Sequence, residues 1–232
     1  VAHRLAAPLA AREVEGAIDW TRRFDLMQQH TGQHLLSAVL EEMFGWPTVS
    51  VHFGAESSTL DIDVGTVSPE AVAAAEVRVN AVVWENRPVR VACEDAAVAT
   101  GLRKATGRSG SIRIVTIADL DRSACGGTHV RATGEIGAIQ LRRTERVKQL
   151  TRIEFLCGGR AVARARRALA ALGSIAAVFS ASLDDAPALV ARQRPVKLGP
   201  IIGDAYALVG GVKADEQIVV SGAQKLADGA PI

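Results

Sequence analysis

Two short motifs that lie far apart in this 232-residue chain constrain its fold more than any other feature. The first is His30-Thr-Gly-Gln-His34, inside an apolar helical run, and the second is Cys125-Gly-Gly-Thr-His129, in a loop of small residues. Because residues four apart lie one above the other on an α-helix, both imidazoles of the first motif can point at one ion. The second motif adds a thiolate and a third imidazole, which completes a nitrogen and sulfur ligand set that zinc prefers. We therefore predict a zinc site whose ligands are His30, His34, Cys125 and His129.

The composition indicates a folded protein without a membrane segment. Hydrophobic residues make up 48% of the chain and charged residues 22%, so a sizeable core is available and global disorder is excluded. The three cysteines provide no even disulfide framework, and the chain has no run of about 18 apolar residues. We expect a cytoplasmic protein that does not bind membranes.

Hydrophobic periodicity predicts an α+β fold, in which helices pack on an antiparallel or mixed sheet. One helix is expected over residues 21–44 and ends at Gly45, a second begins at the cap Ser68, and a third covers residues 159–172. Residues 144–148 are expected to form a basic turn between the last two strands. Alternating apolar and polar residues predict the strands, which are residues 14–20, 49–53, 58–63, 88–93, 112–117, 137–143 and 151–156.

Several motifs together resemble the editing domain of alanyl-tRNA synthetase, and most closely its free-standing AlaX-type relatives. These motifs are residues 25–36, 123–130, 133–137, 145–148 and 151–158, and they occur in the family's order. The resemblance covers about residues 10 to 170 and implies an α+β editing-domain-like core. It also implies that the metal is zinc, with the family's ligands at the four positions predicted above.

The resemblance implies a trans-editing hydrolase, an aminoacyl-tRNA deacylase that protects translation fidelity without ATP. Its partner would be tRNA(Ala) mischarged with serine, and a further substrate would be tRNA(Ala) mischarged with glycine. We expect the protein to be a monomer or weak dimer. An aminoacyl ester is already activated, so the site needs chiefly a positioned water, an oxyanion stabiliser and a pocket for the amino acid. Zinc can activate the water or orient the substrate's α-amino group, and the sequence leaves both open. Four protein ligands also suit a structural zinc, so the alternative is a catalytically inactive tRNA-binding module.

Two residues are candidates for catalysis and specificity near the zinc. Thr31 lies between the two histidines and can hydrogen-bond a serine hydroxyl, or it can bond its own helix carbonyl instead. His52 falls where the synthetase editing domains carry a glutamine, and it can act as a general base if it faces the zinc. Otherwise His52 is an ordinary half-buried strand residue.

Other polar residues are candidates for substrate binding or support. Gln33 adjoins the zinc histidine His34, and Asp121 either orients a ligating imidazole or forms a turn. Basic side chains near the last strands can contact tRNA phosphates, although solvated strand ends carry such residues too. The basic candidates are Arg143, Lys148 and Arg152.

The expected domain organisation has four parts. Residues 1–20 would be the remnant of an N-terminal β-barrel domain, 21–175 the zinc-dependent editing domain, and 176–194 a linker. Residues 195–232 form a β-rich tail that resembles the membrane-proximal end of efflux-pump periplasmic adaptor subunits. Such a pairing indicates a fusion or a chimaeric reading frame, and we expect the tail from Pro195 onward to pack poorly on the core. The alternative is the family's own C-terminal extension.

Overall fold

The computed structural model describes residues 13, 15–192, 197–202 and 205–211, and these divide between two compact units. The first unit is Val1–Ala165 and the second is Arg166–Ile232. Most of the expected barrel remnant, residues 1–12 and 14, and most of the expected adaptor-like tail lie outside the described residues.

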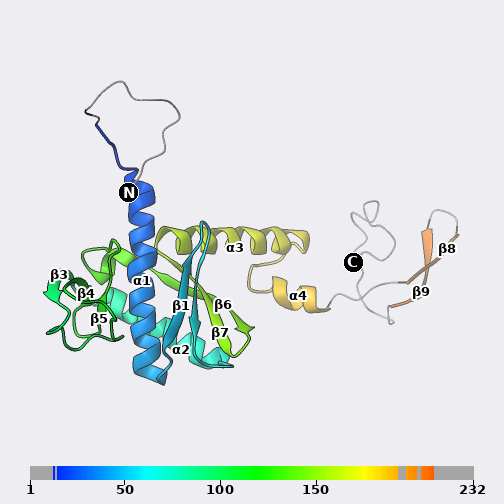
Figure 1. Cartoon of the computed structure of the whole chain (residues 1–232). Helices are drawn as coiled ribbons and strands as arrows, with labels where there is room; N and C mark the ends of the chain where they lie inside the picture. The colour runs from blue at the N-terminus through cyan, green and yellow to red at the C-terminus, as the bar shows by residue number, and fades with distance from the viewer. Residues whose placement is uncertain (1–12, 14, 193–196, 203–204, 212–232) are drawn as a thin grey trace. The chain divides into compact units, whose positions relative to one another are not determined.

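The long helix α1, Trp20–Phe44, carries the first motif near its middle (Figure 1). The Asp19 side chain caps it by accepting a hydrogen bond from the Arg22 backbone N–H at 3.0 Å. The helix ends at Gly45, which has a φ of 67°, a conformation that glycine adopts without strain. Residues 31–40 are all buried, so this half of the helix is part of the core. The predicted helix over residues 21–44 is therefore confirmed.

A four-stranded antiparallel sheet has the order β1-β2-β7-β6. Its strands are β1 Thr48–Phe53, β2 Ser58–Ile62, β6 Ile139–Val147 and β7 Leu150–Cys157. Helix α2, Pro69–Trp84, begins at the cap Ser68 as predicted and contacts both α1 and β6. Alternate residues of β2 and β7 are buried with apolar residues of α1 and α2, so these elements share one core.

A second antiparallel sheet, of three strands, positions the loop that carries Cys125. Its order is β3-β4-β5, with β3 Val89–Asp95, β4 Ser111–Ile117 and β5 Asp121–Ala124. The short 3-10 helix η1, Thr133–Ile136, follows the loop and contacts α1. The fold class is therefore α+β with antiparallel sheets, as predicted.

Helices and a hairpin follow the two sheets in the chain. They are α3 Gly159–Val178, α4 Ala186–Arg192, β8 Lys197–Ile202 and β9 Ala205–Gly210. Among the described residues, no helix is both long enough and apolar enough to cross a membrane.

Several element boundaries differ from the predictions. The strand expected over residues 14–20 is wrong, because residues 15–19 have no regular structure and the Asp19 cap starts α1 at Trp20. The basic turn is shorter than expected, because β6 continues to Val147 and only Lys148 and Gln149 connect it to β7. The first of these two turn residues has a φ of 59°, the left-handed conformation a tight turn requires. The expected linker 176–194 contains the end of α3 and all of α4.

Candidate metal centre

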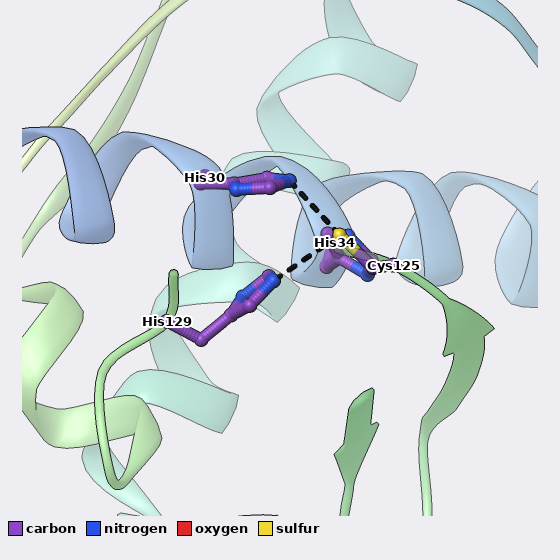
Figure 2. A group of neighbouring side chains, drawn as sticks. All are labelled: His30, His34, Cys125 and His129. Carbon is purple, nitrogen blue, oxygen red and sulfur yellow. Dashed lines mark hydrogen bonds between the residues drawn. The ribbon is translucent and has the colours of Figure 1, made fainter. Parts of the chain in front are cut away.

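Four side chains from α1 and from the loop after β5 converge at one point (Figure 2). One potential ligand atom from each lies within 4.8 Å of the others. The Cys125 Sγ atom lies 3.4 Å from Nε2 of His30 and 3.4 Å from Nε2 of His129. These ligand types and their spacing fit a tetrahedral zinc site. The structure thus brings together all four predicted ligands: His30, His34, Cys125 and His129.

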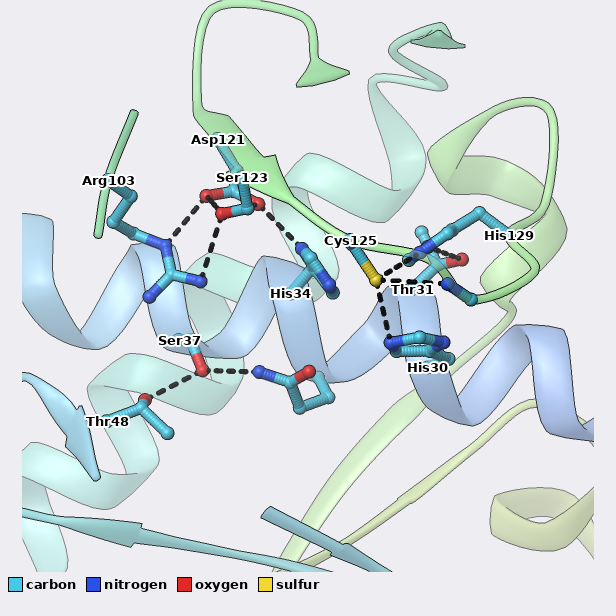
Figure 3. Close-up of polar contacts among 12 residues, drawn as sticks. His30, Thr31, His34, Ser37, Thr48, Arg103, Asp121, Ser123, Cys125 and His129 are labelled. Atoms are coloured by element: carbon cyan, nitrogen blue, oxygen red, sulfur yellow. Dashed lines mark hydrogen bonds and ion pairs between the residues drawn. The ribbon is translucent and has the colours of Figure 1, made fainter. Parts of the chain in front are cut away.

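A buried carboxylate orients His34 from the side away from Cys125. Oδ2 of Asp121 lies 2.8 Å from Nδ1 of His34, and Oδ1 accepts a hydrogen bond from Nε of Arg103 at 2.7 Å (Figure 3). The Ser123 hydroxyl donates to the same carboxylate at 2.9 Å. Burial alone would raise the pKa of Asp121, but His34 and Arg103 outweigh it and lower that pKa. The carboxylate therefore stays ionised, accepts the Nδ1 proton and leaves Nε2 of His34 to bind an ion.

The Thr31 hydroxyl fixes His129 in a corresponding way. Thr31 is fully buried and donates to the Met27 carbonyl of its own helix at 2.9 Å. Its oxygen accepts from the Val130 N–H at 3.1 Å and lies 3.2 Å from Nδ1 of His129. Because the hydroxyl proton is already donated, Nδ1 of His129 must be the donor, and its Nε2 lone pair is left for a metal.

The Cys125 sulfur is held as a thiolate. Burial alone would raise the pKa of Cys125, but its contacts with His129, His30, His34 and the Gly127 N–H lower it to about 3 when the imidazole nitrogens that face the sulfur carry protons. The thiolate is the form that binds a metal ion.

The loop that carries the sulfur is ordered by one guanidinium. Nη1 of Arg113 donates to the carbonyls of Cys125 and Gly127 at 2.8 and 2.6 Å. Gly127 also packs against His30 so closely that an added Cβ would overlap the imidazole ring. Only glycine fits at this position without moving a predicted ligand.

An open pocket of about 500 Å³ adjoins the centre. Its walls come from α1, from β1 and from the segment 103–108, and both Gln33 and His34 line it. This volume lies within the usual range of small-ligand sites. The Gln33 side chain donates to the Ser37 hydroxyl at 2.8 Å, and its Oε1 atom has no hydrogen-bond partner in the described part of the chain.

His52 does not lie with the four ligands. The neighbouring residue of β1, Phe53, contacts His30 with ring centroids 5.2 Å apart. Because successive side chains of a strand point to opposite faces, His52 lies on the other face of the sheet, where it is exposed and pairs with Thr59. That position does not suit the predicted general base.

The basic candidates differ in how they are bound. Arg152 forms a bidentate ion pair with Asp61, at 2.7 and 3.0 Å, so its guanidinium already has an anionic partner. Arg143 and Lys148 are exposed and have no ion-pair partner within the described ranges. The structure therefore leaves only the latter two available to phosphates.

Arg103 is a residue of the site that the sequence did not indicate. It lies outside both motifs and reaches Asp121 from a segment with no helical or strand period. The sequence around a single arginine in such a segment does not indicate that it pairs with the buried Asp121.

The chain is similar to proteins that act on tRNA. Residues 112–154 match the family model described as the threonyl and alanyl tRNA synthetase second additional domain. The chain is 39% identical over 165 residues to the alanyl-tRNA editing protein Aarsd1 of Bos taurus, covering 68% of this chain and 37% of that protein. It is 38% identical over 162 residues to the alanyl-tRNA editing protein AlaX-L of Pyrococcus horikoshii, covering 68% and 40%.

A similarity to a synthetase extends further along the chain. The alanine–tRNA ligase of Methanoregula boonei is 34% identical over 207 residues, which is 83% of this chain and 22% of the ligase. The chain thus spans well under half the length of these relatives. The comparisons support the resemblance to the alanyl-tRNA editing family, and the efflux-adaptor resemblance of the tail has no support among them.

Proposed function

We propose that this chain is a member of the alanyl-tRNA editing family and a trans-editing deacylase. It would hydrolyse the ester that joins serine, and also glycine, to tRNA(Ala). The observation that carries the proposal is the convergence of the four ligand atoms within 4.8 Å beside an open pocket. The similarity to alanyl-tRNA editing proteins over 68% of the chain supports the choice of substrate.

The donor set fits zinc, and three polar residues prepare it. Asp121 and Thr31 hold the protons on Nδ1 of His34 and His129, so both Nε2 atoms are free to bind. Cys125 supplies a thiolate, because its contacts with the protonated imidazoles lower its pKa to about 3, and a bound metal would replace their protons as the positive partner of the sulfur. When bound, zinc supplies a Lewis acid at this end of the pocket.

The pocket offers groups that can hold an aminoacyl ester. Val49 and Val51 of the edge strand line one wall and provide apolar contact for the terminal nucleoside. The Gln33 amide is fixed by Ser37, and its carbonyl oxygen can accept a hydrogen bond from a serine hydroxyl. Alanine has no such donor, so the correct product would bind less well. In this proposal Thr31 acts through His129 and does not contact the substrate.

The test is release of labelled serine from seryl-tRNA(Ala) by the full chain, with and without a chelator, beside correctly charged alanyl-tRNA(Ala). We expect release of serine that the chelator abolishes and that zinc restores, while alanine is spared. Glycyl-tRNA(Ala) in the same assay establishes whether glycine is cleared as well.

Three other outcomes would redirect the proposal. No release by a folded, zinc-loaded sample that still binds tRNA(Ala) would identify a binding module with a structural zinc. Release that the chelator does not affect would separate hydrolysis from the metal centre. Equal release of alanine would remove the proposed role of Gln33 in selection.

A further inference from the structure

A basic segment between β3 and β4 forms one wall of the pocket beside the metal centre. Lys104 and Arg108 both line this pocket, together with the valines of β1 and with His34. Both side chains are exposed, and neither has an ion-pair partner in the described part of the chain. Two available cations therefore border a site whose candidate metal ligands are buried or partly buried.

The charge of this segment is one-sided. From residue 96 to residue 118 the chain contains no aspartate or glutamate, and its basic residues are Arg103, Lys104, Arg108 and Arg113. Two of them are occupied within the fold, because Arg103 bonds Asp121 and Arg113 bonds the carbonyls of the Cys125 loop. The remaining two carry positive charge that no nearby acidic residue of the segment balances.

The base of the segment is fixed to the structure that holds the metal ligands. The Arg103 N–H donates to the Arg122 carbonyl of β5 at 2.8 Å, while its guanidinium bonds the carboxylate behind His34. The Arg122 side chain in turn bonds Glu94 and the Thr100 carbonyl. The segment therefore presents its two free cations from a base that is tied to the metal centre.

Resting on the function proposed above, we propose that Lys104 and Arg108 bind phosphodiester groups of the single-stranded 3′ end of the aminoacylated RNA. The ester is carried by the ribose of the terminal nucleoside, and the nearest phosphate is attached to the other side of the same ribose. An ester placed at the metal end of the pocket therefore puts that phosphate within the same pocket. Cationic side chains are the groups that bind such phosphates without reading sequence.

The experiment measures binding of the full chain to two deacylated RNA minihelices, one with and one without the 3′-terminal CCA, by fluorescence anisotropy at several salt concentrations. The variant, called the loop variant below, is Lys104→Gln/Arg108→Gln, which removes both charges without removing a hydrogen bond or ion pair of the described residues. A control, Arg90→Gln/Arg166→Gln, removes two exposed charges that do not line the pocket. Circular dichroism of each variant verifies that it is folded.

We expect the loop variant to bind the CCA-ended minihelix at least tenfold more weakly at low salt. Its plot of log affinity against log salt should be flatter by about 1.4, since each contact to a single strand contributes about 0.7. The shortened minihelix should bind the loop variant and the unmodified chain equally. The control should lose much less affinity for the CCA-ended minihelix.

Four results would overturn the inference. These are no measurable binding of the CCA-ended minihelix by the unmodified chain, unchanged binding of it by the loop variant, an equal loss in the control, and an equal loss with the shortened minihelix. Because the assay needs no hydrolysis, it separates this inference from the proposed function. If the chain binds the 3′ end through this segment but releases no serine, the result supports this inference and refutes the proposed deacylase activity. Hydrolysis by the unmodified chain together with unchanged binding by the loop variant would support the deacylase and refute this inference.

Discussion

Replacement of Asp121 by asparagine tests how the fold prepares His34 for a metal. The carboxylate receives hydrogen bonds on both oxygens, from His34 on one and from Arg103 on the other. Asparagine keeps the shape but turns one oxygen into an NH₂ group, which then faces one of these donors. If it faces His34, the imidazole must carry its proton on Nε2, where the metal would bind.

The expected effect is a loss of 10- to 100-fold in zinc affinity, the usual cost of removing a carboxylate behind a histidine ligand. This loss corresponds to about 1.4 to 2.7 kcal/mol, since each factor of ten is about 1.4 kcal/mol. The assay is competition for zinc between the protein and a chromophoric chelator at neutral pH. The matched control is Asp63→Asn, which changes an exposed carboxylate and should leave the affinity unaltered.

An unchanged zinc affinity for a folded Asp121→Asn protein would refute the reasoning. It would mean that the position of His34 is set by helix packing alone. A loss of zinc affinity in the Asp63→Asn control would also refute it, because net charge and not the hydrogen bond would then be responsible.

Four further predictions follow from the described contacts. Cys125→Ala should weaken zinc binding and serine release together, and retention of both, by metal analysis and the tRNA assay, would contradict the ligand assignment. Thr31→Val should lower the free energy of unfolding by about 1–3 kcal/mol, because the Val130 N–H loses its hydrogen-bond acceptor. Thr31→Ser keeps the hydroxyl and should retain most of the stability, and urea unfolding measures both variants. Gly127→Ala should reduce zinc affinity by displacing His30, and an unchanged competition assay would show that the loop can yield. In the folded protein the hydrogen bond from Arg152 lowers the pKa of Asp61 against the opposing effect of burial. The ionised carboxylate therefore stabilises the fold at pH values above its ordinary pKa, and this stabilisation is lost as the pH falls through the lowered pKa. Asp61→Asn should therefore cause a small loss of stability at neutral pH that disappears in acid, and a pH-independent difference in urea midpoints would contradict it.

The parts of the site with local patterns were predictable from sequence. The four ligands lie in two i, i+4 pairs, and a helical period under the first pair places its histidines on one face. Helix ends were equally readable, because a capping Ser68 and a left-handed Gly45 act through the backbone of adjacent residues. Such signals depend on neighbours in the chain.

The remaining features depend on register and on distant partners. His52 and Phe53 differ by one position in a strand, and that position decides which of them faces the histidines. No sequence pattern around Arg152 indicates its ion pair with Asp61, which lies opposite it on the adjacent strand. Arg103 lies 18 positions before Asp121 with strand β4 between them, so no spacing rule could identify the pair.

The long separation between the two halves of the metal centre sets the order of events as the chain is made. His30 and Cys125 are 95 residues apart, so the nascent chain completes its first ligand pair well before the second leaves the ribosome. Until then, the helix can offer only two imidazoles, a weak and unselective site. Full ligation requires closure of a loop of that length, and β5, which leads to Cys125, is held by its pairing with β4. Closure of such a loop must be slow compared with formation of the helix itself. Capture of zinc by all four ligands would accordingly follow the docking of the Cys125 loop against α1, and the acquisition of metal would report that this docking has taken place.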